Sequence, residues 1–141
     1  MILYMDASAL VKRYVAEAGS VEVNSWIKVA QMVTTALVSR AELSAALNCA
    51  VRGQMINSTD CQYALDLFRS EWESIVRLPV SEITVQRADF LACRYNLRGY
   101  DAVHLACALI WQESIGNPLT LVTYDQQLRQ AASDEGLALL P

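Results

Sequence analysis

The chain has 141 residues, of which 54% are hydrophobic and 18% are charged, and its 15 acidic and 11 basic side chains give a formal net charge of −4. This apolar composition excludes an intrinsically disordered chain, and the length predicts a single domain over residues 1–141. The acidic balance disfavours a protein that binds nucleic acid through a broad basic surface. If the protein acts on nucleic acid, groups other than its own lysines and arginines must neutralise the phosphates.

No targeting or membrane segment is expected. Residues 1–6 contain no basic region of the kind that opens a signal peptide, and no apolar run approaches the ~18–20 residues of a membrane span. The four cysteines form no Cys-x-x-Cys pair and lie in helical patterns, so we expect buried free thiols in a reducing compartment. These features favour a cytoplasmic protein.

Short apolar runs alternate with longer segments of helical period. In chain order, we predict strands at residues 2–5 and 32–34, helices at 36–51 and 59–74, a strand at 75–78, helices at 81–96 and 101–113, and strands at 119–123 and 137–140. The runs at 2–5 and 119–123 are continuous rather than alternating, which is typical of parallel strands that are buried on both faces. Strands that alternate with helices predict an α/β fold with a mostly parallel sheet.

Two aspartates each follow an apolar strand. Asp6 comes directly after the first strand, and Asp125 comes two residues after the strand at 119–123. Parallel sheets bind ligands beyond the carboxyl ends of their strands, so these carboxylates converge if the two strands are neighbours. The alternative is that each aspartate only caps the helix that follows it.

Glu42 lies inside a predicted helix, on the same stripe as Val38, Ala45, Ala46 and Cys49. An ionised carboxylate on an apolar stripe is costly unless a partner or a metal compensates for it. The alternative is a capping box with Ser39, which requires the helix to begin as late as Ser39.

Asp101 repeats this pattern at the start of the helix at 101–113, with Leu105 and Ala108 on the same face. It is either a functional carboxylate or an N-cap or first-turn acid that the helix dipole favours.

Taken together, the four acids predict a metal site. Carboxylates crowded into one crevice raise one another's pKa values, and a hard cation such as Mg²⁺ or Mn²⁺ relieves the repulsion. Such a site suits phosphodiester hydrolysis. The sequence has no cluster of histidines and cysteines of the kind that binds zinc. His104, the only histidine, is more typical of a hydrogen-bonded core residue than of a ligand. Lys12 and Arg13 follow the first acid and either contact an RNA backbone or form an ordinary solvated helix face.

Four segments of the chain resemble PIN-domain proteins, and most closely the VapC toxins of prokaryotic VapBC toxin–antitoxin modules. They are residues 5–14, 39–43, 97–106 and 121–125, which occur in the family's order and span nearly the whole chain. The resemblance implies a three-layer α/β/α sandwich with a central, mostly parallel sheet. It also implies a Mg²⁺-dependent or Mn²⁺-dependent endoribonuclease that cuts transfer or ribosomal RNA.

The resemblance assigns roles to individual residues. Asp6, Glu42 and Asp101 match the three most consistent acids of the family, and Asp125 matches a more variable fourth. Ser8 and Thr123 match hydroxyl positions beside the site.

The resemblance also implies partners. We expect a homodimer and a small VapB-type antitoxin that covers the active site and supplies the DNA-binding domain. The chain alone should therefore not bind operator DNA.

Two rival functions are considered. One is a catalytically silent PIN-like module that binds RNA or protein, which the intact set of four acids disfavours. The other is a phosphatase with Asp6 as nucleophile. That chemistry generally uses a second acid two residues later, where this chain has Ser8.

Overall fold

The computed structural model describes residues 1–140, which contain one five-stranded sheet. The strands are β1 (Ile2–Met5), β2 (Met32–Ala36), β3 (Val76–Leu78), β4 (Leu119–Val122) and β5 (Ala138–Leu140). Their order is β3-β2-β1-β4-β5, and every neighbouring pair is parallel. All five predicted strands are confirmed, and the carboxyl ends of all five open on the same edge of the sheet.

Within residues 1–140, seven α-helices and two 3₁₀ turns surround this sheet. They are α1 (Ala7–Leu10), η1 (Val11–Arg13), α2 (Ser20–Val29), α3 (Ser39–Arg52), α4 (Ser58–Glu71), η2 (Trp72–Ser74), α5 (Glu82–Tyr95), α6 (Gly99–Ile115) and α7 (Gln126–Asp134). The four long helices predicted from sequence are present. Helix α2 was not predicted, because its β-branched side chains form a weak helical hydrophobic pattern and only Val23 is fully buried.

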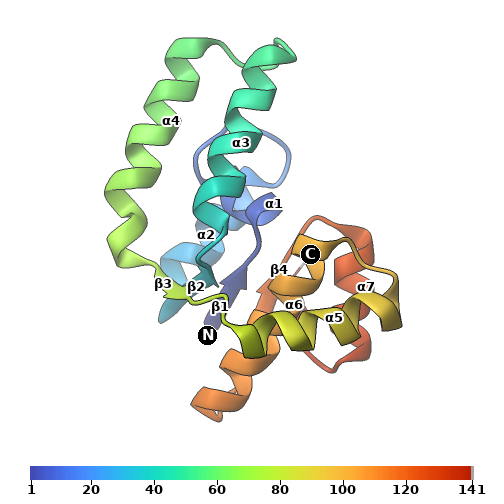
Figure 1. The fold of residues 1–141 in the computed structure, drawn as a ribbon. Coiled ribbons are helices and arrows are strands. Elements are labelled where there is room, and N and C mark those ends of the chain that lie inside the picture. Colours follow the sequence, from blue (N-terminus) through green and yellow to red (C-terminus); the bar gives the residue numbers. More distant parts are fainter. Residues whose placement is uncertain (141) are drawn as a thin grey trace.

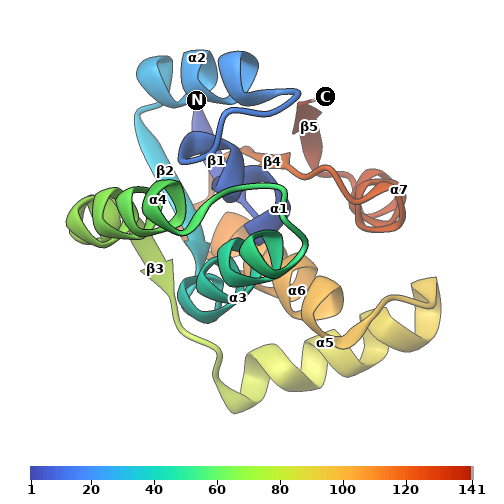
Figure 2. The same cartoon turned by 90° about the horizontal axis from the view of Figure 1, so that it is seen from above.

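Two hydrophobic cores, one on each face of the sheet, make the fold three-layered. In β1, Tyr4 belongs to the core that α5, α6 and α7 cover, whereas Leu3 and Met5 belong to the core under α1 to α4. This alternation follows from the two-residue period of a strand. Figures 1 and 2 show the two groups of helices on opposite sides of the strands. The predicted α/β/α sandwich is therefore confirmed.

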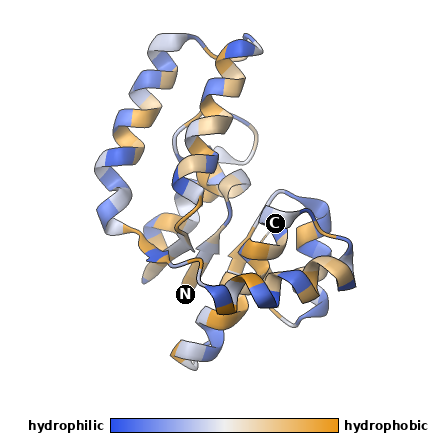
Figure 3. Ribbon diagram, viewed as in Figure 1, coloured by the Kyte–Doolittle hydropathy of each residue, from blue (hydrophilic) through white to orange (hydrophobic). Residues whose placement is uncertain are grey.

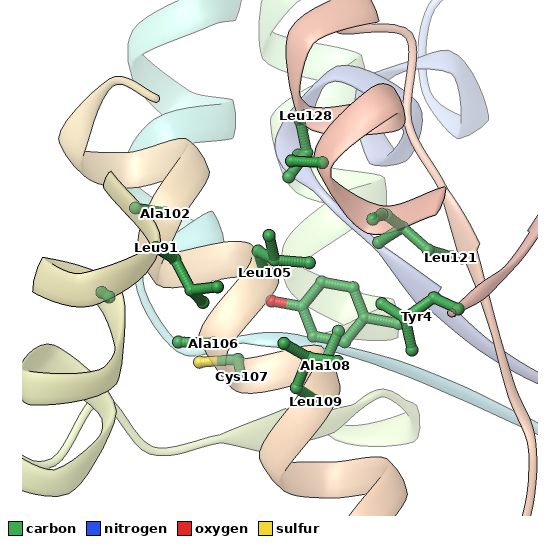
Figure 4. Close-up of a cluster of buried hydrophobic side chains, with 14 of the residues drawn as sticks. Tyr4, Leu91, Ala102, Leu105, Ala106, Cys107, Ala108, Leu109, Leu121 and Leu128 are labelled. Carbon is green, nitrogen blue, oxygen red and sulfur yellow. The ribbon is translucent and has the colours of Figure 1, made fainter. Parts of the chain in front are cut away.

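Helix α6 is the most deeply buried helix of the fold. Its buried side chains run without interruption from His104 to Leu109. Figure 4 shows Leu105, Ala108 and Leu109 around the ring of Tyr4, whose hydroxyl points toward α6. A helix that is apolar on most of its surface packs between other elements, and here it lies between the sheet and α5.

Helices α3 and α4 form a pair that extends away from the sheet (Figure 1). Hydrophobic and hydrophilic residues alternate along both helices in Figure 3, as expected for helices buried on one side.

The structure corrects the prediction for α3. This helix begins at Ser39 rather than residue 36, because Ala36 belongs to β2 and the chain turns before entering the helix. Its buried residues are Ser39, Leu43 and Leu47, whereas Ala45, Ala46 and Cys49 of the predicted stripe are exposed. The two leucines bury more apolar area than alanines would, which places them against the core.

The cysteine prediction is correct for two of the four residues. All four thiols are free, but only Cys61 and Cys107 are buried, while Cys49 and Cys93 are exposed. Among residues 1–140, no helix is long and apolar enough to cross a membrane.

Candidate active site

The carboxyl ends of the two central strands, β1 and β4, meet at one edge of the sheet. Met5 lies opposite Val122 in the parallel ladder, so the residues after each strand are neighbours. A cavity of about 230 Å³ opens here. It is lined by Asp6, Ala7, Ser8, Glu42, Arg98, Asp101, His104, Tyr124 and Asp125. The expected convergence of Asp6 and Asp125 is confirmed, and the other two acids line the same cavity.

Asp6 is the most buried of the four acids, with 3% of its surface exposed. Its Oδ1 accepts a hydrogen bond from the Ala9 amide at 2.9 Å, which caps α1. The hydroxyls of Ser8 and Thr123 donate to the same carboxylate at 2.8 and 2.7 Å. Burial raises the pKa of Asp6 above its usual value, although these donors oppose the shift. Asp6 is thus both a helix cap and a wall of the cavity.

Ser8 and Thr123 connect the ends of the two strands. The Ser8 hydroxyl accepts a hydrogen bond from the Tyr124 amide at 2.9 Å. The Thr123 hydroxyl accepts one from the Asp125 amide at 3.1 Å. Because each hydroxyl also donates to Asp6, the two side chains orient that carboxylate and the segment that carries Asp125.

A single guanidinium bridges the other two aspartates. Arg98 donates from Nε to Asp101 at 2.8 Å and from Nη2 to Asp125 at 2.9 Å, and its side chain is 74% exposed. Asp125 also caps α7, because its Oδ1 accepts a hydrogen bond from the Leu128 amide at 2.8 Å. Asp101 is a first-turn residue rather than an N-cap, because α6 begins at Gly99. Arg98 supplies positive charge where two carboxylates would otherwise repel each other.

Glu42 enters the cavity from the first turn of α3. Its Oε1 lies 2.8 Å from Nε2 of His104, and its side chain is 21% exposed. The capping-box alternative is wrong, although the helix does begin at Ser39. Val38 occupies the N-cap position, and the Ser39 hydroxyl bonds to Thr35 instead.

His104 is a buried core residue with a hydrogen-bond partner at each ring nitrogen. Its Nδ1 lies 2.9 Å from the Tyr4 hydroxyl, and its Nε2 contacts Glu42. The expectation of a hydrogen-bonded core histidine is confirmed, but its contact with a candidate ligand is not anticipated. The spacing contains the signal, since His104 lies three residues after Asp101 and therefore on the same side of α6.

The donor set of the cavity suits a hard divalent cation. Apart from the ring of His104, which is hydrogen-bonded to Glu42, it consists of carboxylate and hydroxyl oxygens, which Mg²⁺ and Mn²⁺ prefer, and contains no thiolate. Across residues 1–140, no three aspartate, glutamate, histidine or cysteine side chains are close enough to hold a metal ion as they stand. In this conformation Asp101 and Asp125 are paired with Arg98, and Glu42 is paired with His104. Direct metal ligation by the four acids therefore stays a prediction.

Lys12 and Arg13 do not line the cavity. Lys12 pairs with Glu17 at 2.9 Å and lies over the ring of Tyr124. Arg13 pairs with Glu71 at 2.7 Å. Both side chains are engaged within the chain, so neither forms a free solvated face.

The sequence profile of the PIN domain matches residues 3–134. This chain belongs to the PIN-domain family. The matched region contains all four acids of the cavity and all of the sheet except β5 and the first residue of β1.

The PIN domain is similar over nearly its whole length to two Mycobacterium tuberculosis proteins. Ribonuclease VapC45 is 29% identical, in an alignment that covers 99% of this chain and 95% of the relative. Ribonuclease VapC47 is also 29% identical, and the alignment covers 96% of this chain and 93% of the relative.

A solved structure supports the fold. PAE2754 from Pyrobaculum aerophilum superposes with a TM-score of 0.68 at 22% identity, and the match covers 99% of this chain and 83% of the other.

Proposed function

We propose that this PIN domain is a metal-dependent endoribonuclease that acts as the toxin of a type II toxin–antitoxin pair. The observation that carries the proposal is the cavity at the carboxyl edge of the sheet, where acids from four segments of the chain converge. The relatives named ribonuclease VapC, which align over nearly the full length, support hydrolysis of RNA phosphodiester bonds. We propose transfer or ribosomal RNA as the substrate.

The four acids Asp6, Glu42, Asp101 and Asp125 would hold a Mg²⁺ or Mn²⁺ ion. When bound, such an ion supplies charge that stabilises phosphate oxygens and makes water a stronger nucleophile. Ser8 and Thr123 limit rotation of the Asp6 carboxylate, so one ligand is oriented before the substrate arrives. Arg98 is the one arginine or lysine in the cavity wall, and its exposed guanidinium provides positive charge toward an incoming phosphate.

The proposal includes partners for the chain. We infer a VapB-type antitoxin, a homodimer and a cytoplasmic location. The net charge of −4 is unfavourable for binding operator DNA, which supports a partner that supplies the DNA-binding domain.

Cleavage of a structured RNA by the purified protein tests this proposal. We expect cleavage with Mg²⁺ or Mn²⁺, none with EDTA, and a loss of about 100-fold or more in Asp6→Asn and Asp101→Asn. These carboxamides nearly preserve shape while removing charge. Asp66→Asn on the exposed side of α4 is the matched control. Unchanged cleavage in both site variants would show that the metal site is assigned wrongly.

The same experiment distinguishes the rival functions. A silent PIN-like module would bind the RNA without cutting it under any divalent cation. A phosphatase would form an acyl-phosphate at Asp6 that chemical trapping detects.

A further inference from the structure

A buried chain of hydrogen bonds leads from the core to the acidic cavity. The Tyr4 hydroxyl lies 2.9 Å from Nδ1 of His104, and Nε2 of the same ring lies 2.8 Å from Oε1 of Glu42. Tyr4 and His104 are almost completely buried, whereas Glu42 borders the cavity. The chain therefore begins in the core and ends at a candidate ligand.

The partners determine which atoms carry hydrogens. An ionised carboxylate only accepts, so Nε2 of His104 donates to Glu42. A ring with its one hydrogen on Nε2 leaves Nδ1 to accept, and the Tyr4 hydroxyl donates to it. Each donor in the chain then has one acceptor.

The His104–Glu42 bond joins the two layers of helices. The buried side chains of α3 belong to the core under α1 to α4, whereas those of α6 belong to the opposite core. The bond occupies one oxygen of Glu42, and the other makes no hydrogen bond to the residues that the structure describes. In metal sites, a ligating side chain is often oriented by a second residue that hydrogen-bonds to it on the side away from the metal. His104 has this relation to Glu42.

We propose that Tyr4 and His104 are positioning residues that fix the Glu42 carboxylate so that its free oxygen faces a divalent cation in the cavity. This inference rests on the proposed function, because it requires Glu42 to be a metal ligand. It adds that the packing around Tyr4 in Figure 4 sets the orientation of that ligand.

Calorimetric titration of the full chain with Mn²⁺ tests the inference. Glu42→Gln shows whether the carboxylate is a ligand. His104→Met keeps similar bulk but removes the donor, and we expect Mn²⁺ affinity to fall by about tenfold or more. His104→Gln retains an amide N–H that can reach Glu42, and we expect it to recover most of the affinity. Tyr4→Phe removes one hydroxyl and should weaken binding about two- to tenfold.

A second readout separates positioning from damage to the fold. As Mn²⁺ is raised, RNA cleavage by His104→Met should approach the wild-type rate, with a higher half-saturating Mn²⁺ concentration. Leu65→Ala, which truncates a buried residue of α4 in the opposite core and away from the cavity, is the control. It should lower the Tm without changing Mn²⁺ affinity.

The possible outcomes identify which proposal fails. If wild type binds Mn²⁺ more tightly than Glu42→Gln, and Tyr4→Phe and the His104 variants equal wild type, the positioning roles are wrong while the nuclease proposal stands. If wild type binds no Mn²⁺, the metal site and this inference both fail. If His104→Met does not fold, His104→Gln and Tyr4→Phe decide the question by the same criteria.

Discussion

Asp6 has a structural role, but its buried position is unfavourable for a negative charge. Three donors, from Ala9, Ser8 and Thr123, hold its carboxylate in place. Burial nevertheless raises its pKa, which means that the folded protein holds the ionised form at a cost. A residue kept despite such a cost is typical of a functional site.

The raised pKa of Asp6 predicts a pH-dependent stability. Between the ordinary carboxyl pKa near 3.8 and the raised value, the folded state binds more protons than the unfolded chain, so the free energy of unfolding falls as pH rises. In EDTA, Asp6→Asn escapes this loss. We expect its Tm to rise relative to wild type as the pH increases above about 4, and a gain of about 3–6 °C would correspond to about 1 kcal/mol.

Thermal unfolding of both proteins across this pH range measures the effect. Asp66→Asn, which removes one negative charge from an exposed position, is the control. A difference between Asp6→Asn and wild type that stays constant with pH would contradict the assigned cause.

Arg98 provides a second prediction for a single residue. Its guanidinium now pairs with Asp101 and Asp125, so it competes with a cation for these carboxylates. We expect Arg98→Gln to bind Mn²⁺ about threefold more tightly, the modest effect expected of exposed ion pairs. Arg94→Gln, which removes the same charge from an arginine paired with Glu135, is the control for calorimetry. Weaker Mn²⁺ binding in Arg98→Gln would mean that Arg98 helps to assemble the site.

Among the elements, the turn after α1 is tied to the end of α4 by an ion pair. Arg13 donates from Nη2 and Nε to both oxygens of Glu71, at 2.7 and 3.2 Å, and from Nη1 to Asn24 at 2.7 Å. A guanidinium that is held by three bonds has a structural explanation without RNA.

This ion pair predicts that Arg13 matters for stability rather than for RNA. We expect Arg13→Ala to reduce the free energy of unfolding by about 1 kcal/mol, a value discounted for partial exposure. RNA binding should not change. Denaturant unfolding and an RNA-binding titration measure the two effects, with Arg69→Ala on the exposed side of α4 as control. Weaker RNA binding at unchanged stability would instead support the RNA-contact hypothesis.

The elements also show how far local pattern extends. Ser81 is the N-cap of helix α5, because its hydroxyl accepts a hydrogen bond from the Thr84 amide in a capping box. Caps depend on residues close in sequence and can be recognised there. The prediction of the buried face of α3 was wrong because a helix of mixed alanine and leucine has two plausible apolar stripes. Contact with α1 and α4 selects the stripe of Leu43 and Leu47, which share a core with Leu3 and Met5 of β1.

At the scale of the whole molecule, which carries a net charge of −4, a bound metal ion would also stabilise the fold. A cation that binds only the folded state stabilises it by mass action, by about 2.7 kcal/mol at a concentration 100 times its Kd. We expect Mg²⁺ or Mn²⁺ to raise the Tm, and we expect the increase to shrink in Asp101→Asn. K⁺ at equal ionic strength controls for general screening of the acidic surface. An equal rise with K⁺ would argue against a specific site.

The amino-acid order was sufficient for the α/β class with a parallel sheet and for the edge of the sheet where the acids gather, whereas the three-layer arrangement came from the family resemblance. Buried parallel strands are continuous apolar runs, and an aspartate that follows such a run lies at the carboxyl end of its strand. Asp6 and Asp125 could therefore be placed together on the condition that their strands are neighbours. Glu42 and Asp101 were candidates because each is an acid among apolar helical residues, and the family motifs supported both.

The partners of these acids could not be derived in the same way. Arg98 bridges Asp101 to Asp125, which lies 27 positions after Arg98, and His104 contacts Glu42 across 62 positions. The depth of Tyr4 and His104 and the exposure of Cys49 likewise depend on how the helices lie against the sheet. Strand and helix patterns arise from neighbours in sequence, whereas hydrogen bonds between distant segments exist only after packing has brought those segments together.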